Sequence, residues 1–306
     1  MSYSLVIPVF NEQETVQALV SRTRAVIDRL DAPAEVILVD DGSTDGTLAL
    51  LRDAHRADAR FKVISFSRNF GHQTAITAGI DHARGEAVIL MDGDLQDPPE
   101  VIPDFVAMWK QGYEVVYAIR TKRKENVVKR AAYAVFYRLL RKLSYLDIPL
   151  DSGDFCLMDR KVVETIRRLP ERNRFVRGLR TWAGFRQTGL AYERDRRFAG
   201  DPKYTLRKLF GLAYDGLFSF STAPLRWVVY FGFLTAALAF LGGLWVVYEK
   251  LVHGIALAGW ASTVVVITFF GGATLLTLGL IGEYVARIFD EVKQRPAYVV
   301  RETIGL

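Results

Sequence analysis

Apolar runs alternate with amphipathic stretches along the first two hundred residues. The run at 4–10 (SLVIPVF) is apolar at nearly every position, as strands buried on both faces are. Similar runs predict strands at 35–39, 62–66, 87–91 and 155–158. Helical spacing predicts helices at 11–30, 46–56 and 73–83, the first opened by a capping box of Asn11 and Glu14. Strands alternating with helices indicate an α/β fold with a mostly parallel sheet covered on both faces.

A different pattern follows near the C-terminus. No charged side chain occurs at 227–248, and none occurs at 251–282. A helix needs about 20 apolar residues to cross the hydrocarbon core of a bilayer, and both stretches are longer than that. We therefore predict two transmembrane helices. The alternative is a helical hairpin buried in a soluble core.

Basic residues flank both predicted spans: Arg207, Lys208 and Arg226 come before them, and Arg287, Lys293, Arg295 and Arg301 come after. Such residues favour the cytosolic side of a membrane. The N-terminal sequence also lacks the basic region and cleavage site of a signal peptide. We expect a multi-pass protein of the plasma (inner) membrane with its N-terminal domain and both termini in the cytosol.

The composition adds a basic surface to this picture. The 306 residues are half apolar, which excludes a disordered protein, and their formal net charge is +6. Many positive charges lie at 120–142, where apolar side chains recur at helical spacing. This predicts an amphipathic helix at about 126–142 on the membrane surface, with a solvated basic helix as the alternative. The expected partner of the charge is anionic lipid and not nucleic acid, because no nucleic-acid motif accompanies it.

The chain therefore divides into four predicted parts. They are a domain at 1–204, a juxtamembrane amphipathic segment at 205–225, a two-helix transmembrane domain at 226–285 and a cytosolic tail at 286–306.

Polar side chains gather where three predicted strands end: Asn11 with Glu12, Asp40 with Asp41, and Asp92 with Asp94. In such sheets ligands bind beyond the carboxyl ends of the strands. Asp92 and Asp94 are suited to Mg²⁺ or Mn²⁺, which would bridge the phosphates of a nucleotide sugar. Taken alone, these residues also fit a simple turn. The other carboxylates favour the metal site, because they would repel one another without a cation.

Seven segments resemble motifs of family 2 glycosyltransferases with the GT-A fold, in the same order: IPVFNEQETV, VDDGSTDGT, RNFGHQTAITAGID, MDGDLQDPPE, DSGDFCLMDR, ERNRFVRGL and AGDPKYTLRK. The resemblance runs from about residue 3 to beyond residue 285. The chain is most similar to polyprenyl-phosphate glycosyltransferases, which include dolichyl-phosphate mannose synthases and bacterial GtrB-like and ArnC-like enzymes. The resemblance implies a cytosolic GT-A domain with a Rossmann-like sheet, interface helices and two transmembrane helices.

The implied activity is a metal-dependent, inverting transfer of a hexose from a nucleotide sugar to undecaprenyl or another polyprenyl phosphate. UDP-glucose is the favoured donor, and UDP-amino-arabinose, a UDP-N-acetylhexosamine and GDP-mannose are the alternatives. A rival from another class is a non-catalytic membrane scaffold that keeps a nucleotide-sugar-binding fold. Glycines at 242, 243, 271 and 272 would allow close helix packing in a homo-oligomer.

The resemblance also implies roles for individual residues. It places Pro8, Phe10, Glu12, Val39 and Asp41 around the nucleoside, Asp92 and Asp94 on the metal, and Gly93 and Gln96 beside the sugar diphosphate. It places Arg120 near the donor and acceptor phosphates, Arg130 on the lipid phosphate, and Arg197 and Lys203 on a loop that closes over the donor.

Four further features of these motifs receive an interpretation. Asp154 matches a family acid close to the reacting centre, where it acts as a base or organises arginines, unless it only caps a turn. His72 has no carboxylate or nucleophile motif paired with it, so we expect it only to begin a helix. Cys156 is expected in the core. The charged segment 171–177 is expected near the acceptor but outside the residues that contact it.

Overall fold

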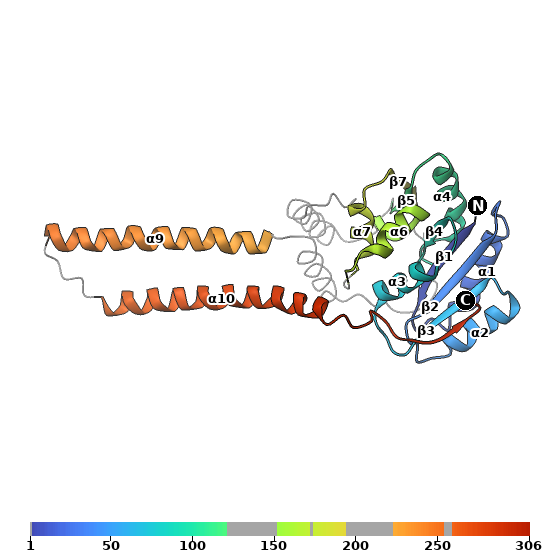
Figure 1. Ribbon diagram of the computed structural model, residues 1–306, viewed down its shortest axis with the longest axis horizontal. Coiled ribbons are helices and arrows are strands. Elements are labelled where there is room, and N and C mark those ends of the chain that lie inside the picture. The colour runs from blue at the N-terminus through green and yellow to red at the C-terminus, as the bar shows by residue number, and fades with distance from the viewer. Residues whose placement is uncertain (1, 121–151, 172–173, 194–222, 254–258) are drawn as a thin grey trace. The chain divides into compact units, whose positions relative to one another are not determined.

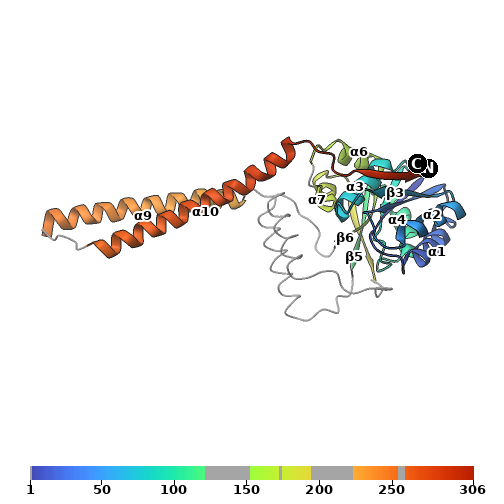
Figure 2. The same cartoon turned by 90° about the horizontal axis from the view of Figure 1, so that it is seen from below.

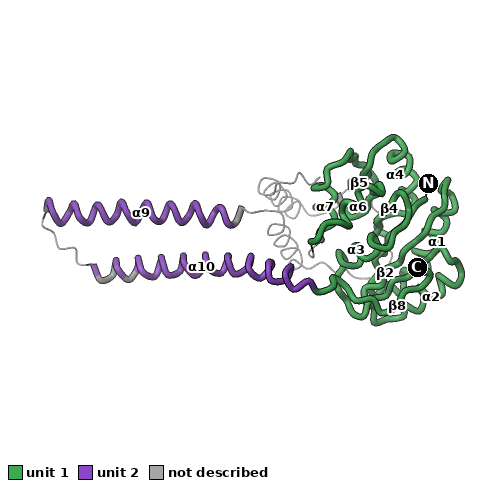
Figure 3. Tube along the Cα trace, in the orientation of Figure 1, with its two compact units in different colours: residues 1–141, 146–209, 295–306 green, residues 142–145, 210–294 purple. Residues whose placement is uncertain are grey.

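The computed structural model describes residues 2–120, 152–171, 174–193, 223–253 and 259–306 (Figure 1). The described residues form two compact units (Figure 3). The first contains the described residues up to Glu193 together with Arg295–Leu306, and the second contains the described residues of Phe210–Gln294. The last part of the predicted tail at 286–306 therefore belongs to the N-terminal domain.

An eight-stranded mixed sheet forms the centre of the first unit, in the order β7-β5-β6-β4-β1-β2-β3-β8. Its strands are β1 (Tyr3–Val9), β2 (Ala34–Asp40), β3 (Phe61–Phe66), β4 (Ala87–Leu90), β5 (Val115–Arg120), β6 (Ser152–Asp159), β7 (Gln187–Tyr192) and β8 (Val300–Ile304). The first four strands pair in parallel, whereas β6 runs antiparallel to β4 and β5, and β8 runs antiparallel to β3. Strand β7 is parallel to β5. The first four predicted strands are confirmed to within one residue at each end.

Helices cover both faces of this sheet, as Figure 2 shows. One face carries α1 (Val16–Ile27), α2 (Thr47–Ala57), the 3₁₀ turn η1 (Pro99–Val101) and α4 (Ile102–Lys110); the other carries α3 (His72–His82), α6 (Arg160–Arg168) and α7 (Val176–Trp182). Side chains alternate along each strand. Leu5, Ile7 and Val9 therefore enter the core under α1, α2 and α4, while Val6 faces α3.

The predicted capping box at Asn11 and Glu14 is wrong, and the first helix begins at Val16. Asn11 has a positive φ of 52°, and its Oδ1 accepts a hydrogen bond from the Thr44 amide at 2.8 Å. Its own amide donates to Ser43 Oγ at 3.0 Å. These contacts join the loop after β1 to the loop after β2. Asn11 and Glu14 are residue types that often cap a helix N-terminus, but the hydrogen-bond partners of Asn11 come from the neighbouring loop after β2.

The second unit is a pair of long helices, α9 (Ala223–His253) and α10 (Trp260–Val292), which run in opposite directions (Figure 1). Each is long and apolar enough to cross a membrane, over Leu225–Val252 and Val265–Val292. None of the residues in the apolar windows is buried within the protein. A soluble core helix would bury such side chains, so the exposed surface favours the predicted transmembrane pair over a buried hairpin.

The chain returns to the sheet after α10. Strand β8 pairs with β3, and the Ser67 amide donates to the Val299 carbonyl at 2.9 Å. The Tyr298 ring stacks on Phe66 with 5.0 Å between centroids, and Phe66 contacts Phe70 edge-on at 5.7 Å. The C-terminal residues therefore support the segment that leads from β3 into α3.

Helix α3 lies close to β1 because residue 79 is glycine. A Cβ atom at Gly79 would overlap Val6 Cγ1. We expect Gly79→Ala to destabilise the protein by about 1–3 kcal/mol through overpacking. This corresponds to a fall in Tm of about 2–10 °C in a thermal unfolding experiment on the purified full chain in detergent.

The control for this prediction is Gly232→Ala in α9, because a Cβ atom there would meet no atom within 4 Å. Adding Val6→Ala to Gly79→Ala should recover part of the loss, since the two sites are in contact and their effects are not additive. Equal Tm values for Gly79→Ala and wild type would contradict the close approach of α3 and β1.

Candidate active site

The predicted acidic clusters meet at the edge where β1, β2 and β4 end. Pro8 and Val39 are buried neighbours in the paired strands β1 and β2, and Phe10 and Glu12 lie half-buried just beyond β1. The Asp40 carboxylate is fully buried and accepts hydrogen bonds from Ser65 Oγ at 2.8 Å and from the Ser43 amide at 3.0 Å. Asp40 therefore organises the turn and is not open to a ligand.

Asp41 fixes the loop that precedes α3. Its carboxylate accepts hydrogen bonds from the Phe70 amide at 2.7 Å and the Gly71 amide at 3.0 Å. Burial raises the pKa of Asp41, although these two amides oppose the shift. The next residue, Gly42, has a φ of 70°, and a Cβ atom there would lie 2.7 Å from the Arg68 carbonyl oxygen. Only glycine fits this close approach of the two loops.

Asp92, Gly93 and Asp94 follow β4 at the same edge. Gly93 is buried, and a Cβ atom there would lie 2.9 Å from the Pro8 carbonyl oxygen, so glycine lets this loop lie against the end of β1. The Gln96 amide donates to Asp94 Oδ1 at 3.1 Å. Burial and the carboxylates of Asp97, Asp154 and Asp94 raise the pKa of Asp92 to about 6, against the opposing charge of His72.

This arrangement fits a divalent cation. Oxygen donors from carboxylates are what Mg²⁺ and Mn²⁺ prefer, and a cation would relieve the repulsion that raises the pKa of Asp92. Within the described ranges no group of three or more His, Cys, Asp or Glu side chains is placed to hold a metal ion.

Asp154 lies between α3 and α7 and is held by side chains from both helices. Its Oδ2 accepts a hydrogen bond from Gln73 Nε2 at 3.1 Å, and its Oδ1 accepts one from Arg177 Nη2 at 3.3 Å. Gln73 Oε1 also accepts from the Val176 amide at 3.0 Å, so this one amide group joins α3, β6 and α7. Burial would raise the pKa of Asp154, but the Arg177 charge and the hydrogen bond with His72 hold that pKa well below its usual range.

His72 connects Asp154 to Asp92. It begins α3, as predicted, and its Nε2 lies 3.4 Å from Asp92 Oδ1 and 3.5 Å from Asp154 Oδ2. Burial disfavours the charged imidazole, but the hydrogen bond with Asp154 and the Asp92 and Asp41 charges raise the pKa of His72 to about 9. The sequence analysis did not predict that His72 lies beside two carboxylates, nor that Arg177 contacts Asp154. The sequence held one indication of these contacts: His72 follows the loop after β3, and this loop lies at the same sheet edge as Asp92.

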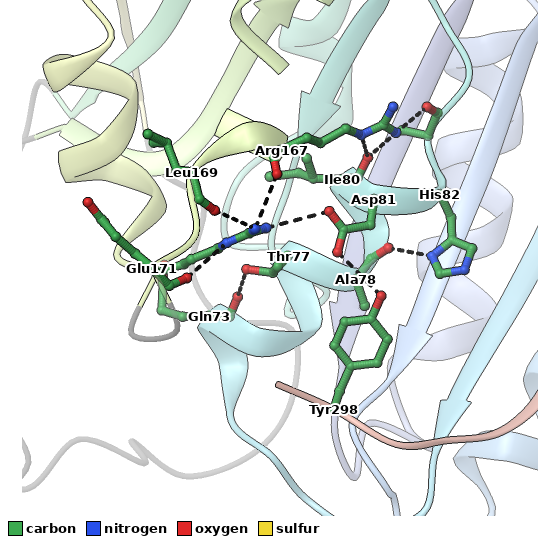
Figure 4. Close-up of polar contacts among 12 residues, drawn as sticks. Gln73, Thr77, Ala78, Ile80, Asp81, His82, Arg167, Leu169, Glu171 and Tyr298 are labelled. Atoms are coloured by element: carbon green, nitrogen blue, oxygen red, sulfur yellow. Dashed lines mark hydrogen bonds and ion pairs between the residues drawn. The ribbon is translucent and has the colours of Figure 1, made fainter. Parts of the chain in front are cut away.

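The far end of α3 is also fixed (Figure 4). Arg167 Nε donates to the Ile80 carbonyl at 2.9 Å, and Tyr298 Oη donates to Asp81 Oδ2 at 3.3 Å. A guanidinium at a helix C-terminus donates hydrogen bonds to carbonyls that have no partner within the helix, and its positive charge interacts favourably with the negative end of the helix dipole. Helix α3 is thus held at its C-terminus by α6 and the C-terminal segment, while its N-terminus presents His72 and Gln73 to the two carboxylates.

Four predicted basic residues are not placed at the site by this structure. Arg130, Arg197 and Lys203, with the predicted interface helix at 126–142 and most of 205–225, lie outside the described residues. Arg120 ends β5, and its backbone alone is described. Cys156 is buried in β6, as predicted.

Comparisons with known proteins agree with this geometry. The family model for glycosyl transferase family 2 matches residues 4–167. The uncharacterized glycosyltransferase YkcC of Bacillus subtilis is 48% identical over 100% of this chain and 95% of its own length. The SfII prophage-derived bactoprenol glucosyl transferase of Shigella flexneri is 41% identical over 99% of this chain and 98% of its own.

A solved structure supports the fold. Glucosyl-3-phosphoglycerate synthase of Mycobacterium tuberculosis, in complex with Mn²⁺, UDP-glucose and phosphoglyceric acid, superposes with a TM-score of 0.50 and 20% identity. The match covers 71% of this chain and 79% of that one.

The contacts of Gln73 generate a prediction that tests the site without any ligand. Gln73→Glu keeps the oxygen that accepts from Val176 but replaces the donor to Asp154 with a second carboxylate. We expect Gln73→Glu to lower the free energy of unfolding by about 1.5–3 kcal/mol at pH 7.5, which is the usual contribution of a hydrogen bond to a charged group. Like-charge repulsion raises the pKa of the introduced carboxyl, so the loss should shrink as the pH falls toward 4 and protonates it.

Thermal unfolding of wild type and variant across this pH range measures the effect. Gln17→Glu, an exposed glutamine of α1, is the matched control and should change Tm little at any pH. A loss that is the same at pH 4 and pH 7.5, or the same in both variants, would refute the proposed contact with Asp154.

Proposed function

The chain belongs to glycosyl transferase family 2, and we propose that it transfers glucose from UDP-glucose to undecaprenyl phosphate with inversion at the anomeric carbon. The predicted family and the GT-A fold are confirmed. The observation that carries the proposal is the acidic pair Asp92 and Asp94 set beside the cluster of Asp154, His72 and Arg177. Relatives named bactoprenol glucosyl transferase, 40–41% identical over nearly the whole chain, support glucose and the lipid acceptor.

The donor would lie along the edge formed by β1, β2 and β4. Pro8, Phe10, Glu12, Val39 and Asp41 would surround the nucleoside, and Gly93 and Gln96 would lie beside the sugar diphosphate. Asp92 and Asp94 would hold Mg²⁺ or Mn²⁺, and a cation there would supply positive charge to stabilise the departing diphosphate. Arg120, Arg197 and Lys203 would add positive charge around the diphosphate, and Arg120 with Arg130 around the acceptor phosphate.

The reaction needs alignment more than deprotonation. A phosphate monoester is already mostly dianionic at neutral pH, so one of its oxygens attacks C1 of the sugar directly. The C1–O bond to the diphosphate breaks, and its electron pair leaves on UDP. A carboxylate with a lowered pKa is a poor proton acceptor, so Asp154 would orient Arg177 and His72 and would not act as a base. Correct placement of the two reactants then supplies much of the rate enhancement.

The membrane explains the architecture. An undecaprenyl chain does not leave the bilayer readily, so its phosphate must be met at the membrane surface. We propose that α9 and α10 anchor the enzyme and that the catalytic domain and both termini are cytosolic, where nucleotide sugars are made. The flanking basic residues support this orientation.

The test uses the purified full chain in detergent with undecaprenyl phosphate and Mn²⁺. UDP-glucose, UDP-N-acetylglucosamine, UDP-galactose and GDP-mannose are offered separately, and lipid-linked sugar is measured by mass spectrometry. We expect product from UDP-glucose and loss of turnover on chelation with EDTA. Asp94→Asn should lower kcat by about 100-fold to 1,000-fold, as removal of one electrostatic stabiliser does.

Asp104→Asn is the control, because Asp104 is exposed on α4 and is not among the residues proposed to bind either substrate, and it should keep wild-type turnover. If product formed from a different donor, that sugar would take the place of glucose in the proposed function. If no donor gave product and the folded protein bound UDP without turnover, the scaffold interpretation would replace the enzyme.

A further inference from the structure

Two arginines of α7 bring more positive charge to the site than the one carboxylate that Arg177 contacts can balance. Arg177 pairs with Asp154, and Arg180 follows one helical turn later with only 1% of its surface exposed. Across the part of the chain that the structure describes, the buried Nε of Arg177 and the buried Nε and Nη2 of Arg180 have no hydrogen-bond partner. Buried guanidinium groups are costly unless an anion or acceptor satisfies them.

The neighbours of this arginine pair do not remove the imbalance. The Asp154 carboxylate already accepts from Gln73 and lies 3.5 Å from His72, so its oxygens are shared among three side chains. The Arg180 guanidinium lies over the Tyr117 ring, 5.1 Å from its centroid, a contact that carries no formal negative charge. Burial raises the pKa of the Cys156 thiol, so Cys156 remains neutral.

The position of the arginine pair suits a second anion. Contacts run in order from Asp92 through His72 and Asp154 to Arg177, with 3.4 Å, 3.5 Å and 3.3 Å between successive polar atoms. The carboxylate end of this series suits a cation with the donor diphosphate, and the guanidinium end suits an anion on the other side of Asp154. The Arg177 side chain is 18% exposed, so a ligand can reach it from solvent.

We propose that Arg177 and Arg180 form the site for the phosphate monoester of the acceptor. Arg177 donates to the phosphate oxygens through its planar guanidinium, which matches phosphate geometry. Arg180 stays buried and acts as a positioning residue whose charge favours the anion. The inference rests on the proposed function and adds to it a phosphate-binding residue on α7.

The test compares substrate dependence in Arg177→Gln and wild type. We expect the KM for undecaprenyl phosphate to rise about tenfold to hundredfold, as loss of a charge-assisted hydrogen bond predicts. The KM for UDP-glucose and the calorimetric Kd of UDP with Mn²⁺ should stay within about twofold. Arg177→Lys, which keeps the charge, should fall between wild type and Arg177→Gln.

Arg168→Gln is the matched control, because Arg168 is exposed at the end of α6 and its loss removes the same charge. It should leave both KM values unchanged. If the acceptor KM rose equally in both variants, the rise would come from the loss of one positive charge anywhere on the domain. That result would overturn the proposed phosphate site.

A second acceptor separates the phosphate from the lipid chain. Farnesyl phosphate carries the same headgroup on a short chain, so Arg177→Gln should raise its KM by the same factor as that of undecaprenyl phosphate. A rise confined to the long chain would assign Arg177 to the lipid, and a weaker Kd for UDP would assign it to the donor. Either result overturns the proposal.

The phosphate site can also be tested if the transfer reaction fails. If wild type makes no lipid-linked sugar, the proposed function fails, and calorimetric binding of farnesyl phosphate still tests the site. Binding that Arg177→Gln abolishes supports an α7 phosphate site, and unchanged binding overturns it. For Arg180, the Arg180→Met variant should weaken farnesyl phosphate binding when its Tm shows that it is folded; full binding by the folded variant would remove Arg180 from the site.

Discussion

The site is arranged around the carboxylate of Asp154, a side chain that is only 12% exposed. It takes hydrogen bonds from Gln73 of α3 and Arg177 of α7, and it shares His72 with Asp92. A buried carboxylate is stable only where donors and positive charges surround it. The need to satisfy Asp154 therefore fixes the N-terminus of α3 and the side chains of α7 relative to the acidic loop after β4.

Helix α3 transmits this constraint through the domain. Gly79 lets it lie against β1, Arg167 binds its C-terminal carbonyls, and Asp81 receives a hydrogen bond from Tyr298. Because Tyr298 follows α10 by only a few residues, the chain that leaves the predicted membrane helix is tied to the helix that presents His72 and Gln73.

The charges of the site divide into two regions, and this division matches a reaction between two anions. The carboxylates of Asp92 and Asp94 suit a cation, which would carry the donor diphosphate, whereas Arg177 and Arg180 suit the acceptor phosphate that we propose. In the proposed reaction, separate positive charges would limit the repulsion between the attacking phosphate and the departing diphosphate. The helices α9 and α10 are long and apolar enough to cross the bilayer in which the lipid chain of the proposed acceptor would lie.

The sequence by itself determined the alternating strands and helices, the two apolar helices, and the acidic residues at 40–41 and 92–94, because these depend on local patterns. It also carried the family motifs, which identified the GT-A fold. Only the tertiary structure decided the partners of Asn11, the return of β8 to the sheet and the roles of His72 and Arg177. Those features depend on contacts between residues 23 to 241 positions apart, and a local pattern does not specify which distant side chain will satisfy a buried polar group.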